Sequence, residues 1–238
     1  MNNQAEDLLV RRSAAWGFTL SATQLEQFAL YAAELVRWNE QTNLTAITDR
    51  QAIYVRHFLD SLLLARYWGP QPHSLIDLGS GAGFPGLPLK ILCPELELLL
   101  VESVGKKTAF LHHLIAQLRL TGVRALTTRA ETIGRDPNER ERYTVVTARA
   151  VADLRVLAEY GLPLLQLGGR LLAPKGSTAH AEAAAAAPAL TALGGELLTI
   201  HPVELPGVEP RALVVIGKVA PTSMRYPRPV GVPSRRPL

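Results

Sequence analysis

Cysteine is almost missing from this 238-residue sequence, and so is any long hydrophobic run. The single thiol, Cys93, rules out an intrachain disulfide and a thiolate zinc cluster. No apolar stretch approaches the roughly 20 residues that a membrane-spanning helix needs. The first residues, MNNQAEDLLVRR, contain no hydrophobic signal region. These absences predict a cytoplasmic protein without metal or membrane contact, and 47% hydrophobic residues supply a sizeable core.

Residues 1–72 predict a helical N-terminal extension. Ser21 and Gln24 form a capping box before apolar residues that recur at helical spacing. Asp49 is a second candidate cap, and the segment 50–68 has the length and composition of another helix. The chain changes character after Gly69-Pro70, where this helix should end.

Residues 73–219 alternate between short apolar strands and helices, which predicts an α/β fold with a mostly parallel, doubly wound sheet. The fifth strand should be followed by an alanine-rich helix on the solvent side and then by a closing antiparallel pair. The expected strands cover residues 74–78, 95–103, 123–128, 144–149, 169–175, 196–205 and 211–219.

The C-terminal tail, residues 220–238, is rich in proline and arginine. The last 20 residues of the chain hold five prolines, four arginines and no acidic residue. Such a composition predicts an extended, polyproline-like segment without helix or sheet. It fits either a solvated, disordered end or an arm that contacts RNA.

A glycine-rich turn follows the first strand, in the stretch IDLGSGAGFPGLPLK. Its core, from Asp77 to Gly83, has the spelling D-x-G-x-G-x-G, and its glycines let the backbone approach a ligand closely. In an open parallel sheet, ligands bind at the carboxyl ends of the strands. Glu102 ends the next strand, 25 residues after Asp77, where a carboxylate could accept hydrogen bonds from a ribose diol.

Two cofactors fit this turn. Gly81, Gly83 and Gly86 match the G-x-G-x-x-G motif of dinucleotide-binding proteins. That motif binds pyrophosphate through free backbone N–H groups, whereas Pro85 and Pro88 each remove a donor. S-adenosylmethionine contains no phosphate, so the prolines favour it, while a dinucleotide or a purely structural turn stays an alternative.

The sequence also limits the atom that would accept a methyl group. Cys93 lies in the helix after the glycine turn, a poor place for the nucleophile that pyrimidine C5 transfer requires. The Asn/Asp-Pro-Pro-aromatic segment typical of exocyclic-amine transfer is replaced by VTARAVADL. An acceptor that needs no deprotonation remains, such as guanine N7, for which the enzyme contributes orientation and desolvation.

Several blocks in the right order make the chain recognisable from Trp38 to the end. They are WNEQTNLTAI, RHFLDSL, IDLGSGAGFPGLPL, VESVGKKTAFL, TARAVADL, APKG, RALVVIGK and YPRPVGVPSRRPL. Together they resemble the bacterial 16S rRNA guanine-N7 methyltransferase family, RsmG, formerly glucose-inhibited division protein B. Phe84 and Pro174 depart from the commoner family spelling, which often has leucine at both positions.

The resemblance implies a Rossmann-like S-adenosylmethionine-dependent methyltransferase that modifies guanine N7 in the decoding region of the small ribosomal subunit. It implies that Arg149 lies between cofactor and target base. Taken with the spelling of the turn, it gives a set of cofactor-binding residues: Asp77, Gly79, Gly81, Gly83, Phe84, Glu102, Ser103, Val104, Ala130, Glu131 and Arg149.

His57 and Asp60 are one helical turn apart and are the other catalytic candidates. Residue spacing alone fits a solvated, ion-paired helix face, whereas the family block points to the active-site mouth. Asp60 could accept hydrogen bonds from guanine N1 and N2. Asn43 is either a turn residue or a polar group near the guanine.

Basic residues gather at the predicted carboxyl edge of the sheet and in the tail, where they would suit RNA phosphates. The alternative is that these residues form solvated surfaces without a partner.

With the RNA-binding interpretation, the expected partner is 16S rRNA or the small subunit, bound by a monomer. Rival functions are a methyltransferase of another RNA, a protein or a small molecule, and a cofactor-binding regulatory protein without catalysis. The candidate RNA-binding residues are Asn43, Lys106, Arg129, Lys175, Arg228, Arg235 and Arg236.

Overall fold

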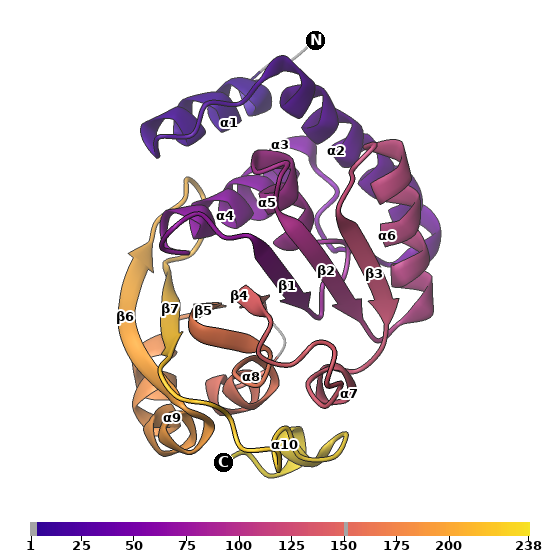
Figure 1. Cartoon of the computed structure of the whole chain (residues 1–238). Coiled ribbons are helices and arrows are strands. Elements are labelled where there is room, and N and C mark those ends of the chain that lie inside the picture. Colours follow the sequence, from indigo (N-terminus) through magenta and orange to yellow (C-terminus); the bar gives the residue numbers. More distant parts are fainter. Residues whose placement is uncertain (1–3, 150–151) are drawn as a thin grey trace.

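The computed structural model describes residues 4–149 and 152–238, so that Ala150 and Val151 of the TARAVADL block lie outside the described residues. Its centre is a seven-stranded sheet in the order β3-β2-β1-β4-β5-β7-β6 (Figure 1). β7 pairs antiparallel with β5 and β6, whereas the other pairs are parallel. This confirms the doubly wound sheet and the closing antiparallel pair. The strands are β1 Ser74–Leu78, β2 Glu97–Glu102, β3 Val123–Thr127, β4 Tyr143–Ala148, β5 Leu165–Lys175, β6 Gly195–Val203 and β7 Arg211–Lys218.

Helices cover both faces of the sheet (Figure 1). Successive side chains of a strand point to opposite faces, so Leu75 joins one hydrophobic cluster and Ile76 the other. The first cluster includes residues of α5 (Gly86–Leu92), α6 (Gly105–Gln117) and the N-terminal helices. The second includes residues of α8 (Leu154–Gly161) and α9 (Ala179–Leu193). A short helix, α7 (Ala130–Ile133), follows β3.

The alanine-rich segment forms the expected helix, α9, but it is not simply a solvent-side helix. Ala183, Ala186 and Ala189 are buried. Residues of α9 contact α8 and β6. Small side chains allow this close approach, which the composition alone did not indicate.

The N-terminal extension forms the predicted helices and shares the first hydrophobic cluster with α5 and α6. α1 (Gln4–Ala15) precedes α2 (Ala22–Thr42), whose capping box at Ser21 is confirmed. Asp49 caps the next helix by accepting from the Ala52 N–H at 2.8 Å.

The helical segments that follow Asp49 run without a break from Arg50 to Arg66, but their hydrogen-bonding pattern changes along the way. α3 (Arg50–Ile53) passes into a π-helical turn (Tyr54–Leu59), then α4 (Asp60–Leu62) and a 3₁₀ turn (Leu63–Arg66). Single π turns inside α-helices occur often at functional sites. This one carries His57 and leads directly into Asp60.

The C-terminal tail contradicts the expectation of an extended segment without helix. It contains α10 (Val232–Arg235), and Tyr226 and Pro233 are buried. Figure 1 shows α10 beside α7 and α8. The tail lacks the apolar pattern for a helix or strand of its own, but hydrogen bonds from the rest of the domain hold it in place.

Candidate active site at the carboxyl ends of the strands

Hydrogen bonds with β2 and with Tyr31 hold the glycine turn in place. The Gly79 N–H donates to the Val101 carbonyl at 2.8 Å, and the buried Tyr31 hydroxyl donates to the Ala82 carbonyl at 2.6 Å. Gly83 has φ +97°, and a Cβ there would lie 2.7 Å from the Tyr31 hydroxyl oxygen. Only glycine fits this position, because both the backbone conformation and the close approach of Tyr31 exclude a side chain.

The first turn of α5 has no N–H group left for a phosphate. Gly86 donates to the Asp77 carboxylate at 3.0 Å, Leu87 donates to the Gly83 carbonyl at 2.8 Å, and Pro88 has no N–H. Pyrophosphate binding at a helix N-terminus depends on such donors. The geometry therefore supports the expectation from the prolines and favours a ligand without phosphate.

Asp77 lies beneath the turn rather than at its surface. It is fully buried, and its second carboxylate oxygen accepts from the Thr147 hydroxyl at 3.1 Å. Burial raises the pKa of Asp77 to about 6, opposed by the hydrogen bonds from Gly86 and Thr147. Asp77 thus positions the turn from below, and its carboxylate does not line the cavity above.

A cavity of about 240 Å³ lies above the ends of β1, β2 and β3 and is called the loop cavity. The structure brings five predicted site residues together in the wall of this cavity. Other lining residues are Leu78, Val101, Tyr160 and two residues of the tail. The five are Gly79, Ser103, Arg129, Ala130 and Glu131.

Two acidic residues of the predicted cofactor set are engaged by the protein itself. Glu102 accepts one hydrogen bond from the Gly81 N–H and one from the Val104 N–H, each at 2.9 Å, and joins the turns after β1 and β2. Glu131 accepts from the Tyr160 hydroxyl at 3.1 Å and from the Gly231 N–H at 2.8 Å. Both carboxylates shape the walls, and their role as ligands of a cofactor stays a prediction.

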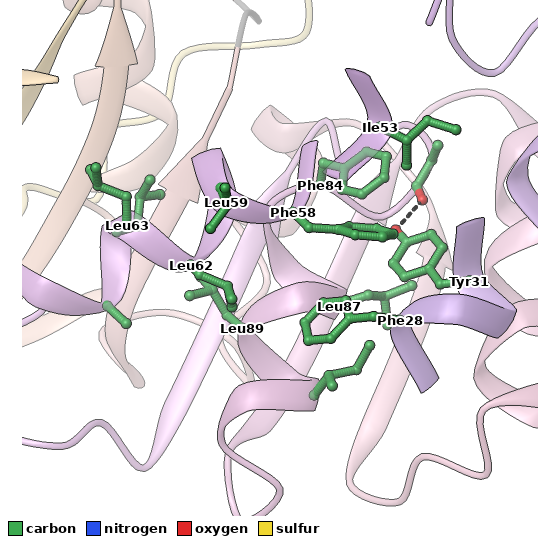
Figure 2. Close-up of a cluster of buried hydrophobic side chains, with 14 of the residues drawn as sticks. Phe28, Tyr31, Ile53, Phe58, Leu59, Leu62, Leu63, Phe84, Leu87 and Leu89 are labelled. Carbon is green, nitrogen blue, oxygen red and sulfur yellow. Dashed lines mark hydrogen bonds between the residues drawn. The ribbon is translucent and has the colours of Figure 1, made fainter. Parts of the chain in front are cut away.

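Phe84 does not point into the loop cavity. Its ring stacks on Tyr31 with centroids 5.1 Å apart and on His57 at 4.4 Å. Figure 2 shows it among buried side chains of the N-terminal helices, beside Phe58. The side chain thus anchors the glycine turn to the extension, and a contact of Phe84 with a cofactor stays a prediction.

Arg149, His57 and Asp60 meet at the end of β4, as the resemblance implied. Arg149 Nη1 donates to Asp60 Oδ2 at 3.0 Å, and Nη2 donates to His57 Nδ1 at 3.3 Å. His57 is 7% exposed and Asp60 2% exposed. The alternative of a solvated helix face is therefore wrong, because both side chains are buried and contact Arg149.

A fourth member of this group, Arg211, was missed by the sequence analysis. Its Nη1 atom lies 3.0 Å from Asp60 Oδ1, so each carboxylate oxygen of Asp60 holds one guanidinium. Asp60 is thus a buried anchor for two arginines and not a free acceptor for guanine N1 and N2. Arg211 begins β7 within the RALVVIGK block, but nothing in the sequence indicated its partner.

His57 is held in one neutral tautomer. Burial and the neighbouring Arg149 lower its pKa to about 3. Because Arg149 only donates, Nδ1 must accept, and Nε2 then carries the proton and donates to the Thr45 hydroxyl at 2.9 Å. At neutral pH the imidazole thus orients Arg149 and carries no charge of its own.

A second concavity, the basic cleft, adjoins Arg149. It combines two neighbouring cavities of about 370 and 420 Å³ that share Arg149, Val208, Glu209 and Arg211. β1 pairs with β4 so that Leu78, in the wall of the loop cavity, lies opposite Ala148, the residue before Arg149. The loop cavity and the basic cleft therefore lie on either side of the point where the strand order reverses, and they share no lining residue. Basic residues in the cleft wall are Arg56, Arg149, Lys175 and Arg211.

Two predicted RNA contacts are committed to ion pairs within the protein. Lys175 lies 2.8 Å from Glu182 and also donates to the Ala152 carbonyl. Arg228 binds the buried Glu159, with Nη2 and Oε2 2.6 Å apart. Both side chains thus have a partner within the protein, from α9 for Lys175 and from α8 for Arg228, and their contact with RNA stays a prediction.

Lys106, Arg235 and Arg236 are exposed, as a phosphate contact requires. Asn43 ends α2 with φ +25°, which fits the turn reading, and it is exposed; its contact with a guanine stays a prediction. Cys93 is buried at the end of α5, as expected for a structural residue.

The chain matches the family model GidB, described as rRNA small subunit methyltransferase G, over residues 24–209. It is 62% identical over 232 residues to ribosomal RNA small subunit methyltransferase G of Roseiflexus sp. strain RS-1, covering 98% of this chain and 99% of that one. The chain belongs to this family. The member from Chloroflexus aggregans is 58% identical over the full length of both chains.

The fold agrees with this membership. A crystal structure of a 16S rRNA (adenine(1408)-N(1))-methyltransferase mutant from Catenulisporales acidiphilia matches with a TM-score of 0.54 at 14% identity, covering 63% of this chain and 87% of that one. At this identity the likeness shows the shared Rossmann-like methyltransferase fold. Among the described residues no group of three metal-binding side chains occurs, and no described helix is long and apolar enough to cross a membrane.

Proposed function

We propose that this methyltransferase transfers a methyl group from S-adenosylmethionine to N7 of a guanine in 16S rRNA. The observation that carries the proposal is the presence of two cavities at the carboxyl ends of the strands: a loop cavity suited to a phosphate-free cofactor and a cleft lined by four basic residues, Arg149 among them. Family membership supports the rRNA substrate.

The residues of the loop cavity fit this cofactor. Its wall combines apolar surface from Leu78, Val101 and Ala130 with the polar groups of Ser103 and Glu131, and the donors of α5 are already used. A cofactor with a nucleoside and an amino acid but no phosphate suits such a wall. When bound, S-adenosylmethionine supplies an activated methyl group on a sulfonium centre.

The reaction at guanine N7 needs no general base. The N7 lone pair is free, so no side chain has to remove a proton before the methyl group is transferred. His57 is neutral and hydrogen-bonded at both ring nitrogens, which suits a positioning role. The protein's contribution is orientation: Asp60 and His57 hold the Arg149 guanidinium in the wall of the basic cleft.

The basic cleft is the proposed place for the target nucleotide. Bases that undergo enzymatic chemistry are turned out of their stack into a pocket. The guanidinium groups of Arg56, Arg149 and Arg211 would balance RNA phosphates there. Because both oxygens of Asp60 are engaged, Glu209, the carboxylate that the described cleft wall presents, is the better acceptor for guanine N1 and N2 protons.

The test uses labelled S-adenosylmethionine and small ribosomal subunits that lack the modification. Borohydride reduction followed by aniline cuts RNA at N7-methylated guanines and maps the product. We expect one labelled guanine N7 in 16S rRNA. Label at another atom, or cofactor binding without transfer, would refute the acceptor.

Arg149→Lys is the informative variant, because it keeps the charge but cannot hold Asp60 and His57 together. We expect methyl transfer to be lost while the protein stays folded. Arg66→Lys is the matched control, since Arg66 is exposed and outside both cavities.

We also propose that the protein acts as a monomer in the cytoplasm. Light scattering of the purified protein would measure its mass and so test the monomer.

A further inference from the structure

We propose that the C-terminal segment, residues 219–238, is a built-in wall of the cofactor site and that α10 sets the affinity for S-adenosylmethionine. The identity of the ligand rests on the proposed function, whereas the wall itself rests on contacts of the tail. Composition alone left open a solvated, disordered end or an arm for RNA. The contacts of the segment point instead toward the loop cavity.

The main anchor of the segment is a buried ion pair. Arg228 donates from Nε and Nη2 to both carboxylate oxygens of Glu159, at 2.9 and 2.6 Å, and its backbone N–H adds a third bond at 2.7 Å. The Glu159 side chain is 1% exposed. A two-pronged pair of this kind fixes direction as well as distance. It holds the chain against α8 three residues before Gly231.

The path to this anchor is fixed by arginines that come from the body of the domain. Arg140 donates to the carbonyls of Tyr226 and Thr222 at 2.7 and 2.9 Å, and Arg135 donates to the Pro227 carbonyl at 2.7 Å. Both donors lie between α7 and β4. The segment is therefore fitted into the domain along its length and does not hang from its end.

From this anchor the segment reaches the loop cavity. The Gly231 N–H donates to Glu131, whose carboxylate also accepts from Tyr160. Gly231 and Ser234 then line the cavity together with Gly79, Ser103 and Ala130. Gly231, the residue before α10, and Ser234 within it thus form part of the cavity wall, and a bound cofactor would lie between the glycine turn and the tail.

This placement separates the two possible roles of the tail. If α10 is a wall, a bulky side chain projecting from it reduces cofactor affinity and leaves the electrostatic part of RNA binding unchanged. If the tail is an RNA arm, cofactor affinity is indifferent to it and the dependence of RNA binding on salt changes.

The test compares two tryptophan substitutions in the same segment of the full-length protein. Ser234→Trp places a large ring at the cavity wall, whereas Val230→Trp places it at an exposed position that does not line the cavity. Ser234 is exposed, so its replacement leaves the core intact. Calorimetry with S-adenosylmethionine and S-adenosylhomocysteine gives Kd, and binding to small subunits at several salt concentrations gives the salt slope.

We expect Ser234→Trp to raise Kd for both ligands about tenfold or more, because the ring overfills the site, and Val230→Trp to bind like the unmodified protein. The salt slope should be the same in all three proteins. An unchanged Kd in Ser234→Trp overturns the inference, as does a salt slope altered in either variant.

Hydrogen exchange gives a readout that needs no substitution. Adding S-adenosylhomocysteine should slow exchange in residues 226–236 together with the glycine turn. Unchanged exchange in the tail when S-adenosylhomocysteine binds would overturn the proposal. If the unmodified protein binds the cofactor but methylates an atom other than guanine N7, the proposed function fails while the inference about the wall stands.

Discussion

The neutral His57 leads to a prediction about stability at mildly acidic pH. Its imidazole accepts from Arg149 through Nδ1 and donates to Thr45 through Nε2, and burial lowers its pKa to about 3. A proton on Nδ1 would face a guanidinium. His57 therefore stays unprotonated in the native state at mildly acidic pH, whereas the same histidine in the unfolded chain takes up a proton near pH 6.5.

The size of the effect follows from the two pKa values. At pH 7.5 the histidine is largely neutral in both states and contributes almost nothing. At pH 5.5 the unfolded chain is protonated, one unit below its pKa, while native His57 is not. Stability should fall by about 1.4 kcal/mol between these pH values on account of His57 alone.

The assay is urea unfolding at pH 7.5 and 5.5 of the unmodified protein and of His57→Gln. Glutamine can accept from Arg149 and donate to Thr45 but does not titrate. Asp77 acts in the opposite direction, because its raised pKa lets the native state take up a proton as the pH falls through 6, but it is present in both proteins and cancels. We expect the loss in free energy of unfolding to be about 1.4 kcal/mol larger in the unmodified protein. Equal losses in both would show that His57 titrates normally and would refute its proposed tautomer.

Three further predictions concern the anchors of the site. Asp60→Asn should lower the free energy of unfolding by about 3–5 kcal/mol, because two guanidinium groups lose a buried charged partner. Urea unfolding measures this loss, and a clearly smaller value would contradict the prediction. Tyr31→Phe removes the buried hydrogen bond to the carbonyl of Ala82, so it should lower the free energy of unfolding by about 1–3 kcal/mol and weaken cofactor binding. An unchanged cofactor Kd by calorimetry would show that this hydrogen bond does not set the shape of the turn. Lys106→Ala should leave stability within about 0.5 kcal/mol but lower the salt slope of RNA binding by about one, and an equal slope would make Lys106 a solvated residue.

Much of the fold could be predicted because its signals are local. The capping box joins Ser21 and Gln24, three residues apart, and the strands show as short apolar runs between helical periods. The glycine turn was also readable, since φ angles above zero and missing donors are properties of the residues themselves. The π turn had no such signal, because no residue type specifies it.

The active-site group was only half readable. His57 and Asp60 share a helix face by spacing, and Arg149 came from the family block, so three of its four members were expected. Arg211 was not, because the attraction between Asp60 and a residue at the start of β7 depends on how the sheet folds back. Burial was misjudged for the same reason: spacing defines a face but not what covers it.

The tail shows most clearly why charge composition is an uncertain guide to partners. An arginine-rich segment without acids attracts any anion, and a buried carboxylate is an anion as much as a phosphate is. Arg228 is drawn to Glu159 on α8, whereas Arg235 and Arg236 remain exposed. The domain supplies the carboxylates that bind Arg228 and the Gly231 N–H, and the arginines that donate to the tail's carbonyls, so the segment is complementary to the surface around α7 and α8. Its folding therefore depends on surfaces formed by distant parts of the chain, and the same contacts that order it bring Gly231 and Ser234 to the cofactor site.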